Sequence, residues 1–338
     1  MSSANNQYPN VSICVPVYNV ELYIERCLIS IMSQTYNGKM ECIIVDDCGI
    51  DNSIAIAEQL IADYNGSIAF KILHHEHNRG LAAARNTAVC VAKGEFIIHV
   101  DSDDWIEPTM VENLVKKQQE TDADIVSCNA IAHYADREEV LQEPTYSSKD
   151  EMIRSTIMLT LDHVIWRRLI RATLYKENNI SAIEGVNIGE DHYTLPRLVF
   201  YANTYAKCDG ILYHYNCIND GSLMHSKNTS FNLKRYLNDR DSIDILISFF
   251  AEHDEKFLEQ LYSIKANYIY EKFFPVLKLL KASIYYQLCE DWESVADKYK
   301  SMPEYRIKLL TSSFYLNVFR VYARVAIKKI SGRKKYNL

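Results

Sequence analysis

Residues 96–104 read Phe-Ile-Ile-His-Val-Asp-Ser-Asp-Asp, and this stretch decides which fold and which chemistry to expect. The run before the acids is almost continuously apolar, as is typical of a strand covered by helices on both faces. In an extended segment residues i and i+2 point the same way, so Asp101 and Asp103 can converge on one hard cation. An acidic turn that caps a helix beginning near Pro108 would give the same residues, and the rest of the chain must decide between these interpretations.

Outward from this stretch, the first third of the chain alternates between two hydrophobic periods. Strand-like runs occupy residues 11–17, 42–45, 69–73 and 96–100, and helical stripes lie between them at residues 23–32, 56–64 and 81–91. Strands separated by helices of this length indicate βαβ units. We therefore predict an α/β fold with a mainly parallel sheet sandwiched by helices.

Polar side chains stand where three of these strands end. Tyr18 and Asn19 follow the first strand, Asp46 and Asp47 follow the second, and residues 101–104 follow the fourth. In open parallel sheets ligands bind beyond the carboxyl ends of the strands. Three strand ends that carry acids or amides therefore predict a single site at this edge.

Composition limits the class of protein and of partner. The chain has 338 residues, of which 48% are hydrophobic and 24% charged, as in ordinary globular domains. Its net charge is −7, and because residues 320–338 hold seven cations and no acid, the remainder carries −14. An acidic body disfavours nucleic-acid binding. The nine cysteines occur without a C-x-x-C pair, and the start of the chain shows no signal or spanning segment, so we expect a cytoplasmic protein.

The last third of the chain has a helical pattern. We place a boundary at a polar link near residue 225, which predicts a catalytic domain at 1–225 and a helical region at 226–338. Residues 314–338 end this region with Arg320, Arg324 and Lys328 on one helical face. That pattern fits a helix lying on an anionic membrane, such as the inner face of the plasma membrane, and it equally fits a core-packing helix with a solvated basic face.

At this point the chain resembles the family 2 glycosyltransferases with the GT-A fold. The similarity covers roughly residues 11–225 and is carried by five motifs in the family's order. They lie at residues 11–19, at 43–47 with 51–53, at 78–81 with 84–86, at 94–104 and at 189–191. The resemblance implies an inverting transfer of a sugar from a nucleotide diphosphate donor, with UDP as the most frequent nucleotide, to a hydroxyl group in surface polysaccharide biosynthesis.

The resemblance also assigns the donor site. The backbone around Pro16 and Tyr18 would hold the nucleoside, and Asp47 would accept a hydrogen bond from the base. Arg79 and Arg85 would bind the diphosphate, although an ion pair between Arg85 and a strand-end aspartate is an alternative.

Asp103 would be the main ligand of Mn²⁺ or Mg²⁺, with Asp101 as the second. Ser102 belongs to the same donor-binding segment, and Asp104 would orient the sugar.

Asp191 would be the catalytic base. Inversion by direct displacement needs a base on the acceptor side, and a carboxylate with a raised pKa can serve. Glu190 is the alternative base or an acceptor contact. Trp166 and Arg168 would line an acceptor subsite, or Trp166 would belong to the core.

Two positions depart from the family's pattern. Where relatives often have Asp-Asp-Gly-Ser, this chain has Cys48 before Gly49, so the turn is expected to be built differently. Where relatives often have arginine, the chain has Asn216, which leaves His214, His225 or Lys227 to close over the diphosphate.

Other classes lack their motifs. A dehydrogenase would need a G-x-G-x-x-G turn after the first strand and a P-loop nucleotidase a G-x-x-x-x-G-K-S/T loop, and both are missing from the sequence. The remaining alternative is a catalytically silent module that binds a sugar nucleotide or a glycan. The expected partners are the nucleotide-sugar donor, a glycan or polyprenyl-linked acceptor and, through the tyrosines of the helical region, a second copy of the chain.

Overall fold

The computed structural model describes residues 8–160, 163–186, 189–219, 233–278, 281–298 and 313–318. The chain forms two compact units, residues 1–226 and 227–338. The candidates His225 and Lys227 and the basic residues from Arg320 onward lie outside the described residues.

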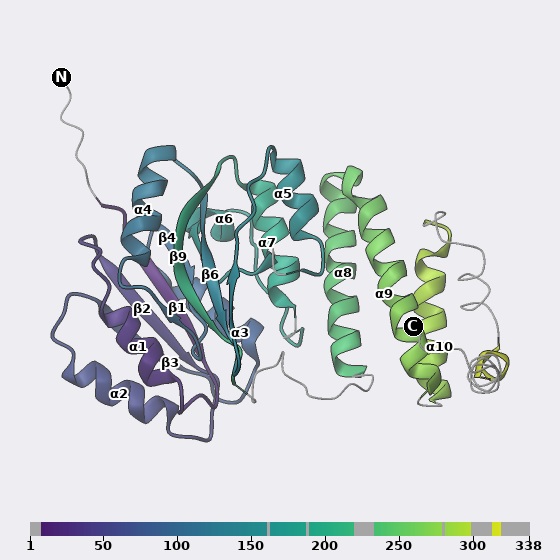
Figure 1. Cartoon of the computed structure of the whole chain (residues 1–338), viewed down its shortest axis with the longest axis horizontal. Coiled ribbons are helices and arrows are strands. Elements are labelled where there is room, and N and C mark those ends of the chain that lie inside the picture. The colour runs from purple at the N-terminus through teal and green to yellow at the C-terminus, as the bar shows by residue number, and fades with distance from the viewer. Residues whose placement is uncertain are drawn as a thin grey trace. The chain divides into compact units, whose positions relative to one another are not determined.

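A nine-stranded sheet forms the centre of the first unit (Figure 1). Its strands are β1 (Val11–Val17), β2 (Met40–Asp46), β3 (Ala69–His74), β4 (Phe96–His99), β5 (Trp105–Ile106), β6 (Ile125–His133), β7 (Glu138–Leu141), β8 (Arg168–Arg171) and β9 (Tyr205–Asn216). The order is β3-β2-β1-β4-β8-β6-β9-β5, and β7 pairs with β6 at the side. The strands β3, β2, β1 and β4 are parallel, whereas β8 runs antiparallel to both β4 and β6.

Helices cover both faces of the sheet. They are α1 (Ile24–Met32), α2 (Ser53–Asp63), α3 (Leu81–Val91), α4 (Met110–Thr121), α5 (Lys149–Thr156), α6 (Ala172–Lys176) and α7 (Glu190–Tyr201). One core joins α1, α2 and α4 to one face of β1, β2 and β4. In Figure 1 these helices lie on one side of the sheet, with α3, α6 and α7 on the other. The predicted α/β sandwich is confirmed, and the mixed half of the sheet, in which β6 and β9 are parallel and β8, β7 and β5 pair antiparallel, is a feature that the strand-helix alternation did not reveal.

The residues of the parallel half explain why it forms. β1 is buried along its whole length, which suits a strand between two helical layers. At the start of β4, Gly94 donates its N–H to Ser12 Oγ at 2.8 Å, and a Cβ there would lie 2.5 Å from Ser12 N. The backbone segments around Gly94 and Ser12 approach each other so closely that this position of the family motif requires glycine. This packing fixes the carboxyl ends of β1, β2 and β4 at one edge.

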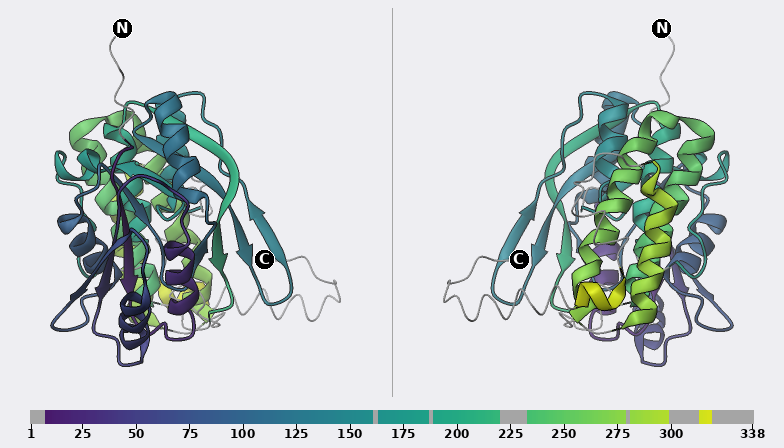
Figure 2. Two further views of the ribbon diagram at one scale, coloured as in Figure 1. Left: turned by 90° about the vertical axis from the view of Figure 1, so that its left-hand side faces the viewer. Right: turned by 90° about the vertical axis from the view of Figure 1, so that its right-hand side faces the viewer.

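The β6–β7 hairpin extends from the sheet in the left view of Figure 2.

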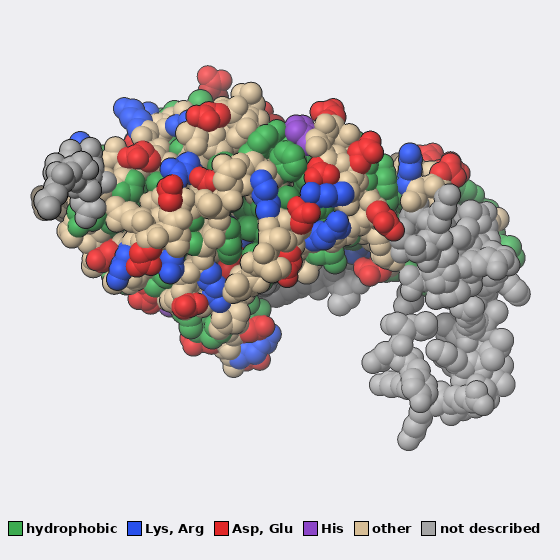
Figure 3. All heavy atoms as spheres, turned by 90° about the horizontal axis from the view of Figure 1, so that it is seen from above, with side chains coloured by type: hydrophobic (Ala, Val, Ile, Leu, Met, Phe, Trp, Pro, Cys, Tyr) green, Lys and Arg blue, Asp and Glu red, His purple; other side chains and the backbone are tan. Residues whose placement is uncertain are grey.

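On the face drawn in Figure 3, the described acidic and basic side chains are interspersed. A nucleic-acid-binding face would instead show clustered Lys and Arg.

The second unit is helical, with α8 (Leu233–His253), η2 (Glu255–Phe257), α9 (Leu258–Lys278) and α10 (Ala282–Ala296). Its core contains Tyr268 and Tyr285, so these two tyrosines pack internally and do not form a subunit contact, whereas Tyr286 is half exposed. Phe314 and Asn317 pack against Tyr285, so the described first turn of the 314–338 segment contacts protein. In the described ranges, no helix has the length and apolarity needed to cross a bilayer.

Candidate active site

The acidic turn after β4 is held in place by α1 and β9. Cys27 Sγ on α1 lies 3.7 Å from the carbonyl oxygen of Asp101, and the backbone N–H of Asp101 donates to Tyr213 Oη on β9 at 3.1 Å. Tyr213 also donates to Asp104 Oδ2 at 2.7 Å. The aspartates of this turn therefore have fixed positions at the edge to which the parallel strands point.

Arg85, in the second turn of α3, joins this turn to a distant segment. Its Nη2 donates to Asp101 Oδ1 at 2.9 Å, and its Nε donates to Glu190 Oε1 at 3.2 Å, although Glu190 is 105 residues away in the chain. Asp191 Oδ1 lies 3.8 Å from Nη2. Of the two roles considered for Arg85, the structure has the ion pair with a strand-end aspartate. We call Arg85, Asp101, Glu190 and Asp191 the Arg85 cluster.

The electrostatics of the Arg85 cluster favour retention of a proton by its carboxyl groups. Burial raises the pKa of Asp101, Glu190 and Asp191, and the negative charge of Asp191 raises the pKa of Glu190 further. The Arg85 guanidinium opposes these shifts, but one cation faces three carboxylates. Adjacent buried acids of this kind titrate as a coupled group. A carboxylate with a raised pKa is what general-base catalysis near neutral pH requires.

Asp191 is buried, and one of its carboxylate oxygens has no hydrogen-bond partner within the described part of the chain. It lies in the first turn of α7, after Gly189, whose φ of 80° suits glycine. Its Oδ2 accepts from the backbone N–H of Ile165 at 3.3 Å. Among the described residues, Asp191 Oδ1 and Arg85 Nη1 are buried without a hydrogen-bond partner. Unpaired buried polar atoms are rare in native structures, and Arg167 Nε in another part of this unit is a further example, so this feature alone does not identify a ligand site.

Asp103, the predicted main metal ligand, is the acidic-turn residue held by Asn219. Its side chain is half-buried, and its Oδ2 accepts from Asn219 Nδ2 at 2.8 Å. No group of three or more metal-ligating side chains occurs within the described ranges. Mg²⁺ is commonly held by one or two carboxylates together with substrate phosphates, so Asp103 with Asp101 fits such an ion. Their assignment as ligands stays a prediction.

Asp104 requires a correction. Its side chain is fully buried, and its Oδ1 accepts from the backbone N–H of Asn216 at 2.7 Å while its Oδ2 accepts from Tyr213. Burial raises the pKa of Asp104 well above its usual range. The carboxyl group therefore anchors β9 and cannot orient a bound sugar. Ser102 is buried as well, and its role in donor binding stays a prediction.

Asp47 organises the loop that leads into α3. Its Oδ1 accepts from Arg79 N at 2.8 Å and lies 2.7 Å from His75 Nδ1, and its Oδ2 accepts from Gly80 N at 2.7 Å. The Asp47 side chain is only 4% exposed, and its role in binding a nucleobase stays a prediction. Tyr18, at the end of β1, is half exposed, whereas the neighbouring Pro16 is buried.

Arg79 is held at the surface. Its Nε donates to Glu184 Oε1 at 2.5 Å, and this hydrogen bond raises the pKa of Arg79. A diphosphate at this point would have to compete with Glu184. The expected role in diphosphate binding stays a prediction.

The turn after Asp47 shows how the displaced glycine is accommodated. The left-handed conformation falls on Cys48, with φ of 60°, at the position where relatives often have glycine. A non-glycine residue there costs about 1–3 kcal/mol. A Cβ on Gly49 would lie 3.1 Å from Asn19 N, so this glycine serves close approach to the end of β1. The left-handed position of this turn is therefore taken by Cys48 and not by Gly49.

Two of the three predicted acceptor residues, Arg168 and Trp166, are buried and do not line a subsite; for Trp166 the structure has the alternative core position. Arg168 and Arg167 are buried and form ion pairs of 2.8 Å each with the buried Glu143. Trp166 is 4% exposed and stacks on Tyr213, so it belongs to the core. Glu143, 25 residues before Arg168 in the chain, is the partner that the sequence did not reveal.

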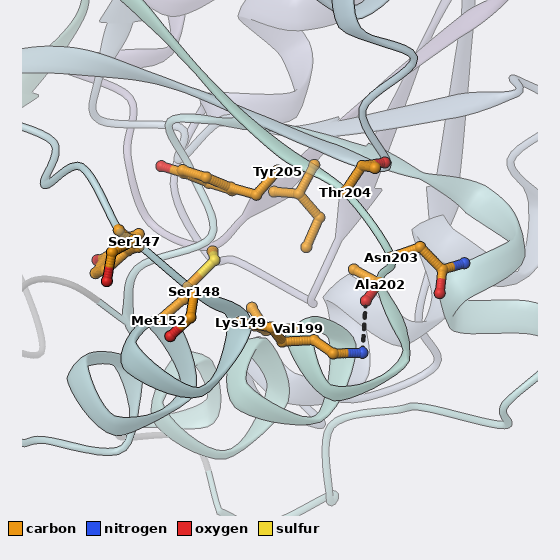
Figure 4. Close-up of a pocket in the computed structure, with 11 residues that line it drawn as sticks. Ser147, Ser148, Lys149, Met152, Val199, Ala202, Asn203, Thr204 and Tyr205 are labelled. Atoms are coloured by element: carbon orange, nitrogen blue, oxygen red, sulfur yellow. Dashed lines mark hydrogen bonds between the residues drawn. The ribbon is translucent and has the colours of Figure 1, made fainter.

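Two cavities flank this part of the molecule. One, of about 510 Å³, is lined by Arg85, Glu190, His99 and Thr194 among others, so it reaches the Arg85 cluster from the side of α3. The other, of about 170 Å³, lies between α5 and the start of β9 (Figure 4). There Lys149 donates to the Ala202 carbonyl oxygen at 2.8 Å, which provides a hydrogen-bond donor for the carboxyl end of α7. Lys149 therefore has a structural role.

Sequence reasoning missed the residues that hold the acidic turn. Tyr213 and Asn216 bind it from β9, more than 100 residues later in the chain. His214, considered for the diphosphate, instead stacks on Trp105 and lies 2.7 Å from Glu107 Oε1. The sequence held one hint of this arrangement, which is the aromatic Trp105 directly after the acids. An aromatic residue there can begin a short strand that pairs with a later strand, as β5 pairs with β9.

Known proteins agree with this geometry. The family model "Glycosyl transferase family 2" matches residues 12–178. YibD of Escherichia coli, named as an uncharacterized glycosyltransferase, is 30% identical over 68% of this chain and 69% of its own length. EpsH of Bacillus subtilis, also named as a glycosyltransferase, is 35% identical over 61% of this chain and 60% of its own. The chain thus matches less than two thirds of the length of EpsH.

The fold has a counterpart among solved structures. S. aureus TarS 1-349, solved in complex with UDP-GlcNAc, superposes with a TM-score of 0.66 at 20% identity, over 97% of this chain and 93% of that one. At this identity the likeness shows the fold alone. Together with the family model and the match to YibD, it leads to one assignment: the chain belongs to glycosyl transferase family 2.

Proposed function

We propose that this protein transfers a sugar from a nucleotide diphosphate, with UDP as the expected nucleotide, to a hydroxyl group of a glycan or lipid-linked acceptor, with inversion at the anomeric carbon. The observation that carries the proposal is the Arg85 cluster, in which one guanidinium holds Asp101 of the acidic turn and Asp191 of the α7 N-terminus together. Donor activation and proton removal thereby come within one small region.

The donor is supported by the edge at which these groups lie. Asp47, Asp101 and Asp103 follow β2 and β4, where nucleotides bind in open sheets. The UDP-GlcNAc complex of TarS, a protein of the same fold, is consistent with UDP, although a more distant neighbour, with a TM-score of 0.51, was solved with GDP-Man and Mn²⁺. Asp103 and Asp101 would hold the divalent ion, which when bound offsets charge on the diphosphate.

The reaction follows from the positions of the acids. The acceptor hydroxyl oxygen forms a bond to the anomeric carbon while the bond from that carbon to the diphosphate oxygen breaks, and its electron pair leaves with the nucleoside diphosphate. Asp191 Oδ1 takes the hydroxyl proton, and Glu190 beside it can share that proton. Burial keeps water from competing with the acceptor, because both acids are less than 10% exposed.

The acceptor is proposed by class only. TarS is named as a poly(ribitol-phosphate) beta-N-acetylglucosaminyltransferase, which favours a growing surface polymer. We propose a cytoplasmic location, with residues 314–338 as a peripheral contact with the inner face of the plasma membrane, because these residues carry seven cations and no acid. Removal of these residues is expected to abolish co-sedimentation with anionic liposomes, and unchanged binding would leave the segment only a packing role.

A donor panel tests the function. Wild-type protein with Mn²⁺ or Mg²⁺ should release nucleoside diphosphate from one UDP-sugar in the presence of acceptor glycans, and Asp191→Asn should not. Binding of UDP-sugars by calorimetry without release by either protein would instead support the catalytically silent module. Arg137→Gln, on the β6–β7 hairpin, is a suitable control because Arg137 is exposed and pairs with Asp136.

A further inference from the structure

The Arg79 and Arg85 side chains that the family motifs offer to the diphosphate are both engaged by carboxylates. Arg79 is bound by Glu184, and Arg85 is surrounded by three acids of the Arg85 cluster. The position where relatives often have arginine is Asn216, whose side chain donates to the Asp103 carbonyl oxygen. A phosphate beside Asp103 therefore needs a cation from elsewhere in the chain.

Arg26 meets this need. It is exposed, in the first turn of α1, and its guanidinium carbon lies 3.5 Å from the centre of the Trp105 ring. Trp105 directly follows the acidic turn and is itself fixed by pairing of β5 with β9 and by stacking on His214. No ion pair joins Arg26 to a carboxylate in the part of the chain that the structure describes.

The neighbouring contacts place Arg26 at the acidic turn. Cys27, the next residue of α1, contacts the Asp101 carbonyl oxygen, and Ser30 Oγ accepts from the backbone N–H of Ile106 at 3.1 Å. The charges of Asp104 and Asp103 raise the pKa of Arg26, against the larger lowering effect of burial. The first turn of α1 and the acidic turn thus form one surface.

We propose that Arg26, held flat on Trp105, is a phosphate-binding residue of the active site and contacts a phosphate oxygen of a substrate beside Asp103. The proposal rests on the proposed transfer reaction and adds a residue that the family motifs do not assign. A planar guanidinium stacked on an indole keeps all its N–H groups in one plane, which suits two hydrogen bonds to one phosphate. The stacking also restricts the Arg26 side chain before the phosphate binds. Binding therefore costs less side-chain entropy than it would for an unrestrained surface arginine.

The phosphate can come from the donor's diphosphate or from a phosphate in the acceptor, and two arms of one experiment separate the sources. In the first arm, calorimetry with Mn²⁺ compares UDP and uridine on wild-type protein and on Arg26→Gln. Loss of a charge-assisted hydrogen bond typically corresponds to about 10-fold or more in affinity. If the donor is the source, UDP affinity falls by that factor and uridine affinity is unchanged.

In the second arm, inorganic phosphate is tested as a competitive inhibitor of the acceptor at saturating donor. If the acceptor is the source, Arg26→Gln leaves UDP affinity unchanged and raises the inhibition constant of phosphate about 10-fold. Equal values for both proteins in both arms would overturn the proposal.

Matched variants separate the cation from its platform. Arg26→Lys keeps the charge without the planar fork and should recover part of the loss, and Trp105→Leu should weaken phosphate binding while Trp105→Phe weakens it less. Arg137→Gln is the control, because Arg137 also stacks on an aromatic ring, 4.1 Å from the centre of Tyr134, but lies on the hairpin. An effect of equal size in Arg137→Gln would show a general charge effect and contradict the assignment.

Failure of the transfer reaction itself can be recognised separately. If wild-type protein releases no nucleoside diphosphate from any donor, pyrophosphate with Mn²⁺ replaces UDP as the probe, because its binding does not depend on Asp191. Tighter binding of pyrophosphate by wild type than by Arg26→Gln would support Arg26 as a phosphate-binding residue. Equal binding by the two proteins would refute that assignment.

Discussion

Two buried ionic clusters lie in the same unit and differ in their balance of charge. The Arg85 cluster sets one cation against Asp101, Glu190 and Asp191, and it borders a cavity of about 510 Å³. The Glu143 cluster sets two cations, Arg167 and Arg168, against one acid, and its side chains are at most 1% exposed.

The difference teaches what distinguishes a working site from a structural one. Burial and ion pairing are common to both clusters, so neither property identifies the site by itself. The Arg85 cluster has more carboxylates than its cation can neutralise, and it has access to a cavity. The Glu143 cluster is closed: Tyr205 donates to Glu143 Oε1 at 2.6 Å, and Arg167 Nε is buried without a hydrogen-bond partner among the residues that the structure describes, so an unpaired buried atom does not distinguish the two clusters either. Excess carboxylate beside an opening is therefore the feature that indicates chemistry.

The largest expected effect comes from the open cluster. Asp191→Asn removes the base and keeps the shape, so kcat should fall by about 10²–10⁴. The free energy of unfolding should stay equal or rise, because one of several crowded carboxylates is lost. Steady-state release of nucleoside diphosphate and urea unfolding measure the two quantities. A variant that kept full activity would remove Asp191 from the mechanism.

The closed cluster should show the opposite pattern. Glu143→Gln leaves two buried guanidinium groups without their counterion, which typically costs about 3–5 kcal/mol of unfolding free energy. In whatever fraction stays folded, kcat should match wild type. Denaturant unfolding, followed by activity per folded molecule, makes the comparison. Loss of kcat without loss of stability would assign Glu143 to the reaction and erase the distinction between the clusters.

A smaller effect concerns pH. The pKa of Glu190 is raised in the folded protein, so its contribution to stability is present below its unfolded value of about 4.3 and is lost as the pH rises through the folded value. Glu190→Gln removes this titration. The unfolding free energy of wild type should therefore fall relative to Glu190→Gln between about pH 4 and the raised folded pKa. A constant difference across that range would show that Glu190 has an ordinary pKa.

The sequence predicted the parallel half of the fold well, because local patterns determine it. The first strand was predicted at residues 11–17 and is found at Val11–Val17. Helical and strand periods carry such information within a few residues. Asp101 and Asp191 both pair with Arg85, whereas their roles in the reaction stay predictions.

The mixed half of the sheet and the roles of single side chains depend on partners far away in the chain. Trp166 and Arg168 were expected at the acceptor, but β8 inserts between β4 and β6, which buries Arg168 beside Glu143. In the sequence Asp104 resembles its acidic neighbours, but in the structure Tyr213 and the backbone of β9 enclose it. Spacing along the chain cannot show which of several adjacent acids will be covered by a strand that comes later.

The most direct test is a crystal structure of Asp191→Asn with a UDP-sugar and Mn²⁺. The account predicts Mn²⁺ bound by Asp103 between the protein and the diphosphate, the uracil beside Asp47, and residue 191 on the open side of the anomeric carbon. A donor bound away from these residues, for example in the cavity of Figure 4, would contradict the assignment of the Arg85 cluster as the transfer site.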